Sequence, residues 1–147
     1  MITQLYGLPR STSDIDVMEM TPADESTVVM RLAEAGSVLA RRYGIYLQYT
    51  AVQTVPESYL DRLVEMFPGW LRKLRLFALD PYDLALSKLE RNTQRDRDDV
   101  KHLAMAVPLD PGVLKGRYEE EMRPYLARPD REDLTLKLWL EMIRNIG

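Results

Sequence analysis

Two aspartates separated by one residue, Asp14 and Asp16, stand in an apolar stretch that follows a turn at Gly7-Leu8-Pro9. If residues 13–20 are extended, alternate side chains project from one face, and the two carboxylates lie roughly 6–7 Å apart at Cα. Mg²⁺ binds oxygen ligands and keeps positions open for water and phosphate, so one or two carboxylates suit it. The pair is a candidate metal site, and a solvated strand face is the alternative.

Polar residues directly before this pair place a cation and three hydroxyls beside the carboxylates. They are Arg10, Ser11, Thr12 and Ser13. This chemistry suits a polyanion held next to a metal. A salt bridge from Arg10 to Asp14 and hydroxyls that satisfy the backbone of the turn are the alternatives.

A second polar block lies near residue 90. Lys88 and Arg91 fall on one stripe of an expected helix, and Asp96 stands three residues after Thr93. Instead of a functional role, Lys88 could be an ordinary surface lysine, and Asp96 could be an acid that caps a helix. A surface salt-bridge ladder is expected for Arg95, Asp99 and His102.

Together the two blocks resemble the nucleotidyltransferase superfamily, in the branch of AbiEii-like proteins, the toxin components of type IV toxin–antitoxin pairs. The sequence G-x-P-R-S-T-S-D-I-D-V at residues 7–17 resembles the metal-binding motif of the superfamily. Residues 80–91 and 95–99 resemble the D-L-x-x-x-K-L-x-R … R-D-x-x-D segment of the branch. Both blocks occur in the expected order, and the resemblance covers the chain to about residue 107.

This resemblance implies roles for the residues of both blocks. Asp14 and Asp16 would hold one or two Mg²⁺ ions, Lys88 would help to bind the triphosphate of an NTP, and Asp96 would also be catalytic. Contacts to the nucleotide are expected from Arg10, Ser11, Thr12, Ser13 and Arg91. The implied partners are an NTP substrate, an RNA or protein acceptor, and a cognate antitoxin.

One motif of the resembling proteins has no counterpart in the sequence. They carry a Gly-Gly or Gly-Ser pair several residues before the G-x-x-R turn, whose backbone N–H groups cradle the triphosphate. Counted back from Gly7, the pair would fall upstream of Met1. Either the true start lies further upstream, which we favour because the candidate catalytic residues are all present, or the cradle is lost and the protein is a weak or inactive relative.

Composition narrows the function classes. A chain of 147 residues with 46% hydrophobic content is long enough for one domain with its own core. The absence of cysteine excludes disulfides, thiolate nucleophiles and zinc–thiolate clusters, and a single histidine excludes a multi-histidine metal site. A net charge of -3 argues against broad nonspecific binding of nucleic acid. With no apolar run of about 18 residues and no signal-peptide pattern, we expect a cytoplasmic protein without a membrane segment.

Periodicity predicts an α/β (α+β) fold: a small mixed sheet of the nucleotidyltransferase type, flanked by helices. The expected strands cover residues 13–20, 45–52 and 74–79, and the expected helices 21–44, 56–67, 80–91, 93–107, 110–126 and 130–147. Residues 1–107 form the predicted core, and residues 108–147 a helical extension packed on the same domain.

The last helix is apolar on more than one face, which predicts burial on two sides and self-association or partner binding through Leu138, Trp139 and Met142. Two functions therefore remain open. One is an Mg²⁺-dependent nucleotidyltransferase, and the other is a catalytically silent relative that binds a partner or a second copy through its C-terminal helices.

Overall fold

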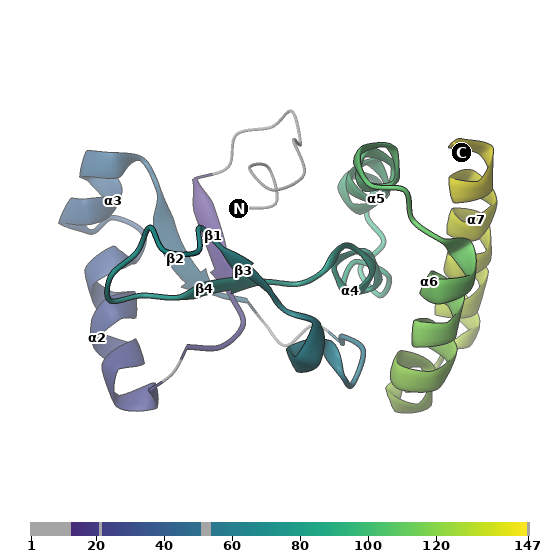
Figure 1. Ribbon diagram of the computed structural model, residues 1–147, viewed down its shortest axis with the longest axis horizontal. Helices are drawn as coiled ribbons and strands as arrows, with labels where there is room; N and C mark the ends of the chain where they lie inside the picture. Colours follow the sequence, from purple (N-terminus) through teal and green to yellow (C-terminus); the bar gives the residue numbers. More distant parts are fainter. Residues whose placement is uncertain (1–12, 21, 51–53, 147) are drawn as a thin grey trace. The chain divides into compact units, whose positions relative to one another are not determined.

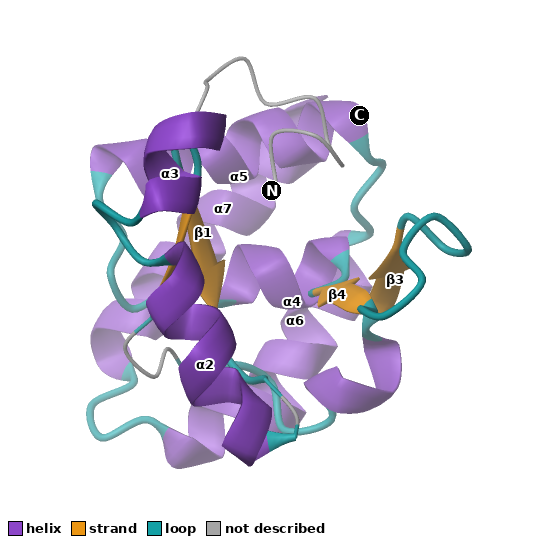
Figure 2. Cartoon of the chain, turned by 90° about the vertical axis from the view of Figure 1, so that its left-hand side faces the viewer, coloured by secondary structure: helices purple, strands orange, loops and turns teal. Residues whose placement is uncertain are grey.

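The computed structural model describes residues 13–20, 22–50 and 54–146. Within these ranges six α-helices and four short strands confirm the predicted α+β class (Figures 1 and 2). The chain divides into two compact units, residues 1–52 and residues 53–147. None of the helices in the described ranges is long and apolar enough to cross a membrane.

The first unit contains a parallel pair of strands, β1 (Asp14–Val17) and β2 (Tyr46–Tyr49), in a register that sets Asp14 opposite Tyr46 and Asp16 opposite Gln48. Parallel strands need a crossover connection. Here two helices supply it, α2 (Ala23–Ala33) and α3 (Val38–Tyr43), and α2 contacts both α3 and β2 (Figure 1).

The single helix predicted over residues 21–44 is wrong, because the chain breaks it between α2 and α3. Glu34 leaves α2 in an extended conformation, and Gly36 follows in a left-handed conformation with φ of 80°. Ser37 then starts α3 as its N-cap and accepts a hydrogen bond from the Ala40 amide. The predicted stop at Gly44 is confirmed, since this residue ends α3 with φ of 70°.

The second unit begins with a 3₁₀ turn, η1 (Tyr59–Arg62), and an antiparallel hairpin of β3 (Val64–Met66) and β4 (Leu76–Ala78). The helix predicted over residues 56–67 is therefore wrong. Leu63 leaves the 3₁₀ turn in an extended conformation, β-branched Val64 continues it, and Phe67 has φ of 52° before Pro68. The strand predicted over residues 74–79 is confirmed as β4.

Four helices follow the hairpin: α4 (Pro81–Leu86), α5 (Gln94–Ala106), α6 (Pro111–Arg117) and α7 (Asp130–Ile146). The predicted starts of the first three are confirmed by the side-chain caps of Asp80, Thr93 and Asp110. Beyond α6 the helical path continues as a π-helical turn, η2 (Tyr118–Met122), and a 3₁₀ turn, η3 (Arg123–Tyr125), close to the predicted end at residue 126.

These four helices enclose the main apolar core. Contacts join α4 to α5 and α6, and join α7 to α5 and α6. The core residues at 2% exposure or less are Ala85, Leu86, Leu89, Val100, Leu103, Leu114, Tyr118 and Met122. The predicted boundary at residue 107 falls inside this unit, within the set of helices that pack on one another.

Helix α7 buries one stripe of side chains, so the prediction that it is buried on two sides is wrong. The stripe consists of Glu132, Thr135, Leu136, Trp139, Leu140 and Ile143. Trp139 is 4% exposed, whereas Leu138 is 56% exposed. Self-association through α7 therefore stays a prediction that depends on Leu138 rather than on the tryptophan.

Candidate active site

The two aspartates of the first unit lie on the same face of β1, as the alternation of a strand requires. Their common neighbour is Gln48 on β2, whose side-chain Nε2 donates to Asp16 Oδ1 at 2.9 Å and lies 3.3 Å from Asp14 Oδ2. Ser13 precedes the strand, and its carbonyl oxygen accepts from the Tyr46 amide at 2.7 Å, which fixes the start of the parallel pairing. One amide nitrogen is thus held between two carboxylates.

The chemistry of these groups fits a hard divalent cation. Asp14 is half-buried and Asp16 is exposed. Among the described residues no cluster of three or more His, Cys, Asp or Glu side chains could hold a metal ion. Two carboxylates with open coordination positions are the donor set that suits Mg²⁺ bound together with a phosphate.

A groove of about 520 Å³ in the first unit is lined in part by Gln48, the residue that contacts both carboxylates. Gln48 lines it together with Tyr46 and Tyr49 of the same strand and Arg31 of α2. Its volume falls within the range of small-molecule sites, and its lining combines two aromatic rings with one basic side chain and one acidic side chain, Glu34. Gln48 is therefore shared between the groove and the carboxylate pair.

Lys88 lies in the second unit, in the turns that follow α4, and it is only 9% exposed. Its ammonium nitrogen lies 3.1 Å from Asp99 Oδ2 and 3.7 Å from Asp96 Oδ1. The alternative of an ordinary surface lysine is therefore wrong. The expected surface ladder is also wrong for Asp99, which is 7% exposed and holds this lysine.

Asp96 is fully buried and completes a capping box at the start of α5. Its side chain accepts from the backbone amide and the hydroxyl of Thr93, and Thr93 Oγ1 accepts from the Asp96 amide. Arg91 donates to the same carboxylate, at 2.9 Å from its Nε. Burial alone would raise the pKa of Asp96, but the hydrogen bonds from Arg91 and Thr93 outweigh it and hold the pKa well below its usual range.

The capping role that stood as the alternative for Asp96 is thus confirmed. Arg91, predicted to bind nucleotide, is 56% exposed at its side chain while its guanidinium is bound to Asp96. Lys88, Arg91, Asp96 and Asp99 form one cluster of two cations and two anions at the turn between α4 and α5.

The remaining predicted positions cannot be placed beside these groups. Arg10, Ser11 and Thr12 lie outside the described residues. Asp14 and Asp16 belong to the first unit and Lys88 and Asp96 to the second. The joint role in catalysis that the resemblance implies for these two pairs therefore stays a prediction.

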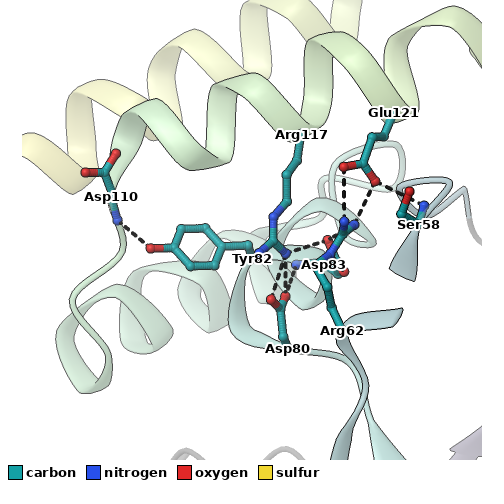
Figure 3. A network of polar contacts seen from close by, with 8 residues as sticks. All are labelled: Ser58, Arg62, Asp80, Tyr82, Asp83, Asp110, Arg117 and Glu121. Atoms are coloured by element: carbon teal, nitrogen blue, oxygen red, sulfur yellow. Dashed lines mark hydrogen bonds and ion pairs between the residues drawn. The ribbon is translucent and has the colours of Figure 1, made fainter. Parts of the chain in front are cut away.

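A second charged network in the second unit was not predicted from the sequence (Figure 3). Asp83 on α4 is fully buried and accepts from Arg62 at 2.9 and 3.1 Å and from Arg117 at 2.9 Å. Arg62 also binds Glu121, and Arg117 also binds Asp80. The sequence marks Asp80 as a helix cap, but its ion-pair partner Arg117 lies 37 residues away, and no local pattern pairs the two.

Electrostatics in this network favour the charged forms. The hydrogen bonds that Arg62 donates to Glu121 and Asp83 raise the pKa of Arg62, and the hydrogen bond from Arg62 lowers the pKa of Glu121. The ring of Tyr82 stacks under Arg117 at 4.8 Å, and its hydroxyl accepts from the Asp110 amide at 3.0 Å. The network joins η1, α4, α6 and η2, so we assign it to the fold of the second unit.

Comparison with known proteins gives one finding for the whole chain. Residues 4–146 match the model of a family described as nucleotidyltransferase of unknown function (DUF6036). No curated protein and no solved structure gives a significant match.

Proposed function

The chain belongs to the DUF6036 family of nucleotidyltransferases, and on that premise we propose that it transfers a nucleotide from an NTP to an RNA or protein acceptor with Mg²⁺ at Asp14 and Asp16. The observation that carries the proposal is the convergence of both carboxylates on one amide of Gln48. The shared amide holds two aspartates side by side on one strand face, and a pair of adjacent carboxylates is a donor set suited to a divalent cation that assists phosphate chemistry.

The proposed reaction forms one bond to the α-phosphorus and breaks another. A nucleophilic oxygen of the acceptor bonds to the α-phosphorus of the NTP, the bond from that phosphorus to the bridging oxygen of the β-phosphate breaks, and pyrophosphate leaves. The proton of the acceptor hydroxyl passes to a carboxylate or to water. A bound Mg²⁺ neutralises charge on the phosphate oxygens and aligns the triphosphate.

The side chains of the chain have distinct parts in this scheme. Asp14 and Asp16 hold the cation, and Arg10 with the three hydroxyls of residues 11–13 contacts the triphosphate. Lys88 adds positive charge toward the phosphates, and Asp96 keeps Arg91 and the lysine in place. The AbiEii-like relationship, a toxin role and a cognate antitoxin belong to the same proposal and depend on the motif resemblance.

A second candidate is a catalytically silent member that binds a partner. The contacts of Lys88 favour it, because its ammonium is matched by Asp99 and Asp96, as in a purely structural cluster. Lys88→Met tests the role of this lysine. Loss of NTP affinity in a variant that remains folded supports a nucleotide-binding role of Lys88, whereas loss of stability with unchanged NTP affinity supports a structural role.

The test of the proposed function is cation-dependent binding of an NTP, measured by calorimetry with each of the four NTPs. We expect binding that needs Mg²⁺ and that is lost in Asp14→Asn and in Asp16→Asn. Asp98→Asn is the matched control, because Asp98 is an exposed aspartate of α5 that accepts a hydrogen bond from Gln94. Binding that survives both substitutions, or no binding of any NTP by the unaltered chain, would count against the site.

A further inference from the structure

Gln48 has a position that the family resemblance does not assign. It stands opposite Asp16 in the parallel register, one strand away from both candidate metal ligands. Its side-chain nitrogen lies 2.9 Å from Asp16 Oδ1 and 3.3 Å from Asp14 Oδ2. Each of the two carboxylates therefore has one oxygen next to the same amide group.

An amide NH₂ has two hydrogens and no charge, so it can donate to two acceptors without forming a rival ion pair. Ionised carboxylates are acceptors only, and two of them on one face of a strand repel each other. A donor between them offsets part of that repulsion and fixes the rotation of each carboxylate. With one oxygen of each group directed at Gln48, the second oxygen of each group is also given a direction.

We propose that Gln48 is a positioning residue that orients Asp14 and Asp16 for a divalent cation, an inference that rests on the proposed function. Hydrogen bonds to the outer oxygens of metal-binding carboxylates raise metal affinity, and their loss commonly costs about 10–100-fold. The side-chain amide of Gln48 donates to both carboxylates.

The experiment measures Mn²⁺ affinity in the absence of nucleotide, by electron paramagnetic resonance of free Mn²⁺. Gln48→Met keeps the length of the side chain and removes its donors, and Gln48→Thr keeps strand propensity but cannot reach both carboxylates. We expect each to weaken Mn²⁺ binding by about 10–100-fold. Gln94→Met is the matched control, because it removes a 2.9 Å Gln–Asp hydrogen bond on the exposed side of α5 and should leave Mn²⁺ affinity unchanged.

A purely structural role of Gln48 would lower the melting temperature without changing the Mn²⁺ affinity of the folded protein. Wild-type Mn²⁺ affinity in folded Gln48→Met and Gln48→Thr would therefore overturn the proposal. Asp14→Asn in the same assay separates this failure from a failure of the proposed function. If Asp14→Asn loses Mn²⁺ and the Gln48 variants do not, only the positioning role is wrong; if Asp14→Asn also binds normally, the metal site itself is wrong.

Discussion

Asp83→Asn should destabilise the second unit by about 3 kcal/mol. The carboxylate is fully buried between Arg62 and Arg117, whose side chains are 21% and 17% exposed. Removing one partner of a buried ion pair costs about 3–5 kcal/mol, since a charge is left uncompensated. We take the lower end because Arg62 keeps Glu121 and Arg117 keeps Asp80 as partners.

For a unit of this size, 1 kcal/mol shifts the melting temperature by about 4–8 °C, so the substitution should lower it by about 12–24 °C. Urea unfolding followed by tryptophan fluorescence measures the free energy directly. Trp139 is 4% exposed and reports on the core, whereas Trp70 is 84% exposed and should change little. Replacing Trp70 by Phe in all proteins compared leaves one reporter.

Asp98→Asn controls for the loss of an aspartate at an exposed position. It should change the free energy of unfolding by less than about 0.5 kcal/mol. If Asp83→Asn were also within about 0.5 kcal/mol of the parent protein, the buried network would not stabilise the fold as we reason.

Three further predictions concern α5, the pH dependence of stability, and α6–α7. Thr93→Ala removes the cap of α5 and should cost about 1 kcal/mol in urea unfolding; no loss would contradict the capping box. The lowered pKa of Asp96 contributes stability that is present above about pH 4 and lost as the pH falls. Asp96→Asn should therefore reduce the fall in the free energy of unfolding at acid pH, and an unchanged fall would show that Asp96 is not its cause. Burial and the hydrogen bond to Asp133 raise the pKa of Tyr118, so its contribution is present below about pH 10 and lost above it; Tyr118→Phe should remove this alkaline loss, and an unaltered alkaline limb would contradict it.

Local chemistry accounts for what the sequence predicted well. Asp80, Thr93 and Asp110 each stand directly before a helix and accept from its first amides, so the residue type and its spacing mark the start without distant information. The alternation of side chains along a strand likewise predicted that Asp14 and Asp16 share one face. The contacts of Gln48 with both carboxylates agree with this prediction.

Tertiary contacts account for the elements and side-chain pairs that the sequence predicted poorly. Residues 56–67 have helical spacing of apolar side chains, yet Val64 to Met66 pair with β4, and that pairing overrides the pattern. Lys88 and Asp99 looked like surface charges because nothing in the sequence shows that the turns after α4 place the ammonium against α5. The pairing of Arg62 and Arg117 with Asp83 joins three separate segments, which periodicity cannot predict.

The central claim, transfer of a nucleotide rather than of a terminal phosphate, is tested most directly with an NTP labelled at either its α- or its γ-phosphate. We predict that the unaltered chain with Mg²⁺ moves the α label to an RNA or protein acceptor, releases the γ label as pyrophosphate, and does neither once Asp14 and Asp16 are both replaced by Asn. Transfer of the γ label to the acceptor, or α-label transfer that persists in the double Asn variant, would contradict the assignment of nucleotidyl transfer to this pair of aspartates.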